Sequence, residues 1–164
     1  MSVSVHQFIV ICFFVAVAWA AVGDLRSFRI PNRLVLLVIG FYPAHFLASP
    51  QPVDWVAGLI CGAVVFFLGF FAFSRGLIGG GDVKLLSAVA LWAGPKLIFP
   101  VMLLTMASGG ILAGMFLVHA FVQSRSQLGG NVLARKAMLS APVPYGIAIA
   151  IGAAYLTGRL LLTI

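Results

Sequence analysis

Apolar segments follow one another along almost the whole chain, separated by short polar stretches. Hydrophobic residues make up 63% of the 164 residues and charged residues only 8%, whereas soluble domains carry about 25% charged residues. Runs of about 20 apolar residues are typical of membrane-spanning helices. The sequence therefore predicts an all-α, polytopic membrane protein. We expect a bundle of six transmembrane helices that forms a single domain over residues 1–164.

The fourth predicted span is short. From Asp82 to the break expected at Gly94 and Pro95, it rises only about 18 Å, whereas the hydrocarbon core is ~30 Å thick. If this helix reaches the outer surface, Asp82 lies at membrane depth, where an ionisable residue indicates a functional site. The six predicted spans cover residues 7–23, 32–48, 54–73, 83–93, 97–122 and 142–162.

The basic residues predict the orientation of the bundle. Eight of the ten Lys and Arg residues lie on one side of it, namely Arg26, Arg29, Arg33, Arg75, Lys84, Arg125, Arg135 and Lys136. Basic loops stay in the cytoplasm, so both termini are predicted outside it. The net charge of +7 is then explained by topology and anionic lipids, and no nucleic-acid partner is predicted. The first span lacks the basic start of a signal peptide and is expected to be retained.

Three aspartates are the only acidic residues of the chain. Asp54 precedes the third span on the outer side, where it is predicted to cap that helix. Asp24 and Asp82 lie on the cytoplasmic side. Two carboxylates in one low-dielectric site do not both ionise readily, so such a pair shares a proton. One carboxylate can then activate water while its protonated partner polarises a peptide carbonyl, an arrangement that needs no metal or cofactor.

Structural roles for these two aspartates are the first alternative. Asp24 would then be a surface residue paired with Arg26 or Arg29. Asp82 would cap the helix that follows the glycines at 79–81. In the same region, Asn32 follows Pro31 and is predicted to cap the second span.

Other functions form the second alternative. A small proton-coupled transporter would use Asp24 and Asp82 as a proton relay, but the chain has no internal repeat. A scaffold protein with a decayed site is disfavoured because both aspartates are present. No metal site is predicted, since His6 and His45 lie toward the outer side and His119 toward the cytoplasm. The sequence contains neither an HExxH nor a GxSxG motif.

Three motifs carry a resemblance to a known family. Residues 79–82 read Gly-Gly-Gly-Asp, which fits the G-x-G-D pattern of intramembrane aspartic proteases, and Val-Lys follows at 83–84. Asp-Leu-Arg at 24–26 and Ile-Pro-Asn at 30–32 lie upstream. With Val-Pro-Tyr-Gly at 143–146, similar to a proline-glycine motif near the family's C-terminus, the chain resembles type IV prepilin peptidases.

The resemblance implies an enzyme of the inner (cytoplasmic) membrane that removes the short basic leader from prepilins and pseudopilins at the cytoplasmic face. Asp24 and Asp82 would be its catalytic pair. The loop that shapes the site would comprise Gly79, Gly80, Gly81 and Lys84, with Pro144, Tyr145 and Gly146 at its border. The implied partners are the prepilin, the lipid bilayer and the pilus assembly machinery.

The cysteines set this chain apart from the longer members of the family it resembles. Those members carry paired CxxC motifs in a cytoplasmic insertion and also methylate the new N-terminus. Here Cys12 and Cys61 lie far apart inside apolar segments. We therefore expect no zinc-binding methyltransferase domain and no methyltransferase activity. The compact form is similar to the TadV/CpaA group, which serves tight-adherence (Flp-type) pili.

Overall fold

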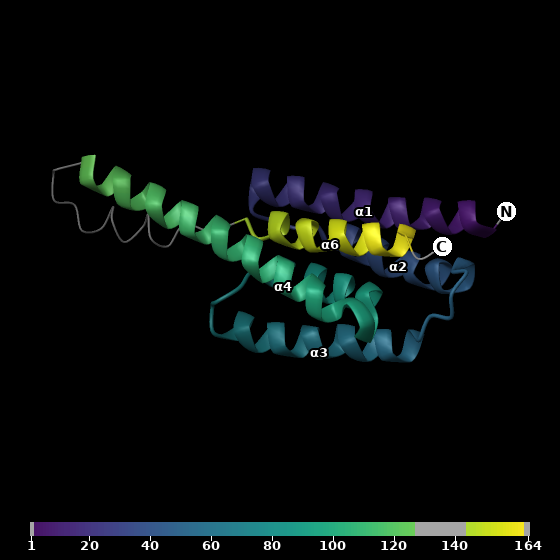
Figure 1. Ribbon diagram of the computed structural model, residues 1–164. Coiled ribbons are helices and arrows are strands. Elements are labelled where there is room, and N and C mark those ends of the chain that lie inside the picture. The colour runs from purple at the N-terminus through teal and green to yellow at the C-terminus, as the bar shows by residue number, and fades with distance from the viewer. Residues whose placement is uncertain (1, 127–143, 163–164) are drawn as a thin grey trace.

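The computed structural model describes residues 2–126 and 144–162, which form helices connected by short loops (Figure 1). None of these described residues forms a β-strand, so the all-α prediction is confirmed for them. Arg135, Lys136 and the predicted start of the last span at Pro142 lie outside the described residues. The helices are α1 (Ser2–Ser27), α2 (Asn32–Ala48), α3 (Trp55–Ser74), α4 (Gly80–Ser126) and α6 (Gly146–Leu162).

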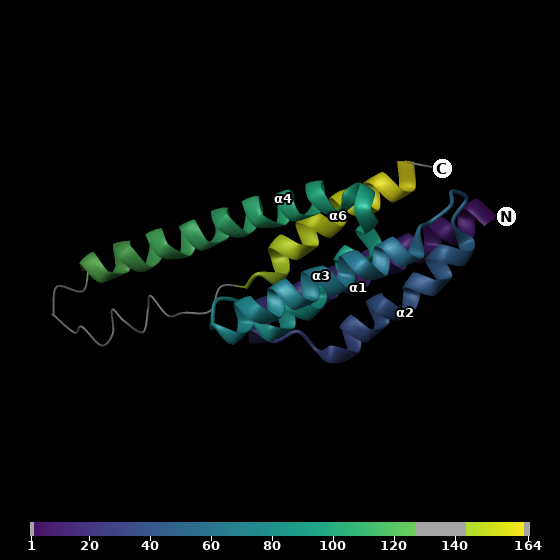
Figure 2. The same ribbon diagram turned by 90° about the horizontal axis from the view of Figure 1, so that it is seen from below.

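Helix α4 consists of two segments joined at Gly94. The backbone of this glycine is not helical (φ 55°, ψ −172°), and Pro95 follows it directly. Such a backbone conformation is open almost only to glycine. The predicted break between the fourth and fifth apolar segments is thereby confirmed. The chain turns back at this point, so the second segment runs toward the opposite end of the bundle and extends past it (Figure 2).

Three of the helical stretches are long and apolar enough to cross a membrane, namely Val5–Ser27, Trp55–Ser74 and Gly80–His119. The third of them contains the break at Gly94. Helices α2 and α6 are also apolar but have 17 residues each. These lengths and compositions indicate an integral membrane protein. The count of six spans and the location of the termini stay predictions.

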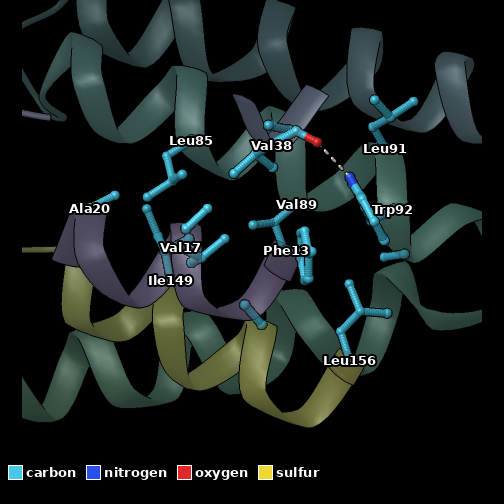
Figure 3. Close-up of a cluster of buried hydrophobic side chains, with 14 of the residues drawn as sticks. Phe13, Val17, Ala20, Val38, Leu85, Val89, Leu91, Trp92, Ile149 and Leu156 are labelled. Carbon is cyan, nitrogen blue, oxygen red and sulfur yellow. Dashed lines mark hydrogen bonds between the residues drawn. The ribbon is translucent and has the colours of Figure 1, made fainter. Parts of the chain in front are cut away.

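The buried core joins α1, α2, α4 and α6 (Figure 3). Trp92 of α4 lies at its centre, where its ring stacks on Phe13 with centroids 4.2 Å apart. Its indole N–H donates to the backbone carbonyl of Val38 in α2 at 2.9 Å, which satisfies the one polar atom of the ring. Ile149 and Leu156 bring α6 into the same cluster. This packing fixes where α1 ends and where α4 and α6 begin.

Helix α3 packs mainly against α4 and presents most of its side chains outward (Figure 1). Its two buried residues are Gly58 and Gly62. Small residues at this spacing let two membrane helices approach closely, whereas the large apolar side chains face lipid. The observed bounds, Trp55–Ser74, differ from the predicted 54–73 by one residue at each end.

Candidate active site

Asp24 lies in the last turn of α1 and is buried, with 5% of its surface exposed. Helix α1 ends just after it, because the backbone N–H of Phe28 donates to the Asp24 carbonyl at 2.8 Å and Phe28 adopts a left-handed φ of 50°. The Oδ2 atom of Asp24 accepts a hydrogen bond from the backbone N–H of Gly146 at 2.9 Å. The alternative of a surface carboxylate is therefore wrong.

Gly146 begins α6 against the end of α1. A Cβ atom at this position would lie 2.9 Å from the Cβ of Asp24 and 3.2 Å from the Cα of Ala21. Only glycine allows the two backbones to come this close. Of the neighbouring motif residues, Pro144 is fully buried. Tyr145 packs on α4, where a Cβ at Gly109 would lie 3.2 Å from its ring.

Asp82 is the third residue of α4, and Gly79 occupies the position before the helix. The backbone N–H of Gly79 donates to the Asp82 carboxylate, and the Gly79 carbonyl accepts from the N–H of Val83 at 3.1 Å. This reciprocal arrangement is the capping box of helix starts. The expectation that Asp82 itself occupies the cap position is thus corrected. No described group donates to the buried Oδ1 atom of Asp82.

The glycine run lets the start of α4 pass between two neighbouring segments. A Cβ at Gly80 would lie 3.2 Å from the ring of Phe73 at the end of α3. A Cβ at Gly81 would lie 3.1 Å from the Cβ of Ile30, in the segment that follows α1. The absence of side chains on these glycines therefore brings α4 next to the loop that leaves Asp24.

The carboxylates of Asp24 and Asp82 are close enough for their charges to interact. They come from different helices, α1 and α4, and are far apart in the sequence. The third acid, Asp54, lies at the other end of α3, where its side chain accepts from the N–H of Ala57 at 2.9 Å. Its predicted role as an N-cap is confirmed. The structure thus separates one capping aspartate from two neighbouring buried or half-buried ones, which we call the aspartate pair.

Lys84 links the start of α4 to the start of α2. Its ammonium group is exposed and donates to the Oδ1 atom of Asn32 at 3.1 Å. The predicted capping role of Asn32 is wrong, because Pro31 occupies the cap position in an extended conformation and no side chain caps α2 there. Asn32 is instead the first helical residue, which leaves its side chain free to accept from Lys84.

Two histidines form a contact that the sequence did not predict. The Nε2 atom of His6 lies 3.0 Å from the Nδ1 atom of His45, and each residue is 2% exposed. The ring of His45 also stacks on Trp92 at 4.7 Å. An antiparallel pairing of the first two spans would have placed these residues together. Among the described residues no group of three side chains could hold a metal ion.

Comparison with known proteins assigns this architecture to a family. Residues 10–114 match the model of the type IV leader peptidase family. The chain belongs to this family. The family assignment does not favour the proton-coupled transporter. No solved structure is significantly similar to the chain.

Two similar proteins are each called prepilin leader peptidase/N-methyltransferase. The protein of Bacillus subtilis (strain 168) is 30% identical over 161 residues, which cover 96% of this chain and 58% of the relative. The protein of Xanthomonas campestris pv. campestris is 27% identical over 146 residues, or 85% of this chain and 45% of the relative. This leader-peptidase family member thus spans about half the length of the relatives that it matches.

Proposed function

We propose that this chain is a membrane aspartic endopeptidase that removes the leader from prepilins, with Asp24 and Asp82 as its catalytic pair. The observation that carries the proposal is the meeting of these two carboxylates at the end of α1 and the start of α4. The family assignment and the names of both similar proteins support the same activity. In a membrane, an ionisable pair held between helices is a strong indication of function.

The proposed reaction is hydrolysis of one peptide bond by a carboxylate and a carboxylic acid. The ionised aspartate takes a proton from water, whose oxygen attacks the peptide carbonyl carbon. The protonated aspartate donates its proton to the carbonyl oxygen, giving a neutral tetrahedral diol. The C–N bond then breaks. The leaving nitrogen takes the proton held by the first aspartate, and one diol hydroxyl returns a proton to the second, so the pair is restored.

The loop glycines and Lys84 fit this proposal as supporting residues. Gly79 donates to Asp82, and Lys84 holds the start of α4 against α2 through Asn32. The concentration of basic residues near these loops supports a site that faces the cytoplasm, at the inner membrane. The resemblance to the compact TadV/CpaA group supports an Flp-type prepilin as the substrate.

Co-expression with an Flp-type prepilin tests the function. Wild type is expected to shorten the precursor on a gel, whereas Asp24→Asn and Asp82→Asn leave it uncut. Asp54→Asn is the matched control, because asparagine remains a good N-cap, and it is expected to cut like wild type. Processing that survives both single changes in the pair would refute the proposed mechanism.

Two further measurements on the same system sharpen the result. Cleavage by purified protein is expected to persist in the presence of a metal chelator. Activity that a chelator abolishes and zinc restores would exclude the metal-free mechanism. The mass of the new pilin N-terminus tests the expectation of no methyltransferase activity. An unmethylated N-terminus in the presence of a methyl donor is the expected outcome, and a gain of one methyl group would contradict it.

A further inference from the structure

Gly146 contributes a backbone donor to the aspartate pair, at the place where that donor is most needed. Asp24 lies in the last turn of α1, where the unpaired carbonyl groups of a helix carry partial negative charge and disfavour a carboxylate. The first N–H groups of a helix carry the opposite partial charge. Gly146 is the first residue of α6, and its N–H lies 2.9 Å from the Oδ2 atom of Asp24. The start of α6 thus counteracts the end of α1.

The environment of Asp82 differs in one atom. Its carboxylate lies in the first turn of its own helix and accepts from Gly79, which by itself would also favour a negative charge. Its Oδ1 atom, however, is buried, and no described group donates to it. A buried charged oxygen without a donor is penalised more than a helix dipole stabilises it. An oxygen that carries a proton avoids this penalty and becomes a donor.

We propose that Gly146 is a positioning residue that holds Asp24 as the ionised, water-activating carboxylate and leaves Asp82 as the protonated partner. The proposal rests on the proposed function. It assigns both proton transfers of the reaction. The water proton moves to Asp24, and the proton of Asp82 moves to the peptide carbonyl oxygen. When the C–N bond breaks, the leaving nitrogen takes the proton from Asp24, and Asp82 recovers a proton from the diol.

Two substitutions at Gly146 separate its N–H from its lack of a side chain. Gly146→Ala keeps the donor but adds a Cβ close to Asp24 and Ala21. Gly146→Pro adds a comparable atom and also removes the donor, at the first helical position, where proline is tolerated. The difference between the two variants therefore reports mainly the hydrogen bond to Asp24.

The expected result is a split between kcat and KM, measured with purified protein and purified prepilin in detergent. Gly146→Pro should have a kcat lower than that of Gly146→Ala by about tenfold to a hundredfold, which is the range for a hydrogen bond to a charged group. The KM values of the two variants should agree, because the donor acts on the reacting carboxylate. Equal kcat values would mean that Gly146 only provides space, and would overturn the proposal.

Infrared spectroscopy tests the proton assignment without any turnover. At neutral pH the wild-type protein should show the carbonyl band of a protonated carboxyl group, and Asp82→Asn should lose it. A band that persists in Asp82→Asn, or is absent from wild type, would overturn the proposal. If wild type leaves the prepilin uncut, the proposed function fails, while the infrared band still decides which aspartate carries the proton.

Discussion

Replacing Gly69 by alanine tests whether the packing of α3 positions Asp82. A Cβ at Gly69 would lie 2.7 Å from Cγ1 and 3.1 Å from Cγ2 of Val83, the residue that follows Asp82. Carbon atoms in contact prefer about 3.5–4.0 Å, so the overlap is roughly 1 Å. Val83 is buried, and a β-branched side chain in a helix has a single favourable rotamer. The first turn of α4 must therefore move, and Asp82 with it.

The expected loss of stability follows from two opposing terms. Overpacking by one methyl group costs about 1–3 kcal/mol, whereas replacing a helical glycine by alanine stabilises by about 0.5–1 kcal/mol. We expect a net destabilisation of about 1–2 kcal/mol, at about 2–4 °C in unfolding midpoint per kcal/mol for a chain of this size. Turnover should fall further than stability, by roughly a hundredfold, if the carboxylate is displaced by about 1 Å.

Thermal unfolding and prepilin cleavage, both in detergent, measure the two effects. Gly40→Ala is the matched control, because no heavy atom lies within 4 Å of the added Cβ, and it should match or exceed wild type in stability. Adding Val83→Ala to Gly69→Ala removes the overlapping methyl groups. The double variant should therefore be more stable than the sum of the two single changes predicts. A Gly69→Ala variant with wild-type stability and turnover would refute the reasoning.

Three further substitutions are expected to change the unfolding midpoint. Asp54→Ala removes the acceptor for the N–H of Ala57 and should destabilise by about 1 kcal/mol while cleavage continues. Gly94→Ala forces a side chain into a glycine conformation at φ 55° and should cost about 1–3 kcal/mol. Loss of the buried contact to His6 in His45→Leu should cost about 1–3 kcal/mol, part of which a second change, His6→Leu, should recover. An unchanged midpoint would contradict the corresponding account.

Local features of this fold could be predicted from the sequence because neighbouring residues determine them. The bounds of α2 agree with the prediction for residues 32–48, since Pro31 and the polar stretch after Ala48 mark its ends. The break at Gly94 and the cap at Asp54 likewise depend on one residue and its neighbours. Helix α1 extends beyond the predicted 7–23 to Ser2–Ser27, because backbone hydrogen bonds continue the helix past the end of the apolar run.

Contacts between distant helix ends could not be predicted in the same way. The bond from Gly146 to Asp24 joins residues 122 positions apart, and the bond from Lys84 to Asn32 joins residues 52 apart. Hydropathy indicates which segments are helices but not which of their ends meet. The motifs did indicate the regions that form the site. The atom of Gly146 that contacts Asp24 is a backbone N–H, and its position depends on the packing of α6 against α1.

The three aspartates share one structural device, and their tertiary positions decide what it does. Each carboxylate accepts from a backbone N–H at the start of a helix. The donors are Ala57 in α3, Gly79 before α4 and Gly146 in α6. A neutral donor stabilises a carboxylate less strongly than a Lys or Arg side chain, which would hold it fully ionised. At exposed Asp54 the result is a helix cap. Where two such carboxylates approach each other away from water, the same weak stabilisation leaves room for one shared proton, which is what hydrolysis by an aspartate pair requires.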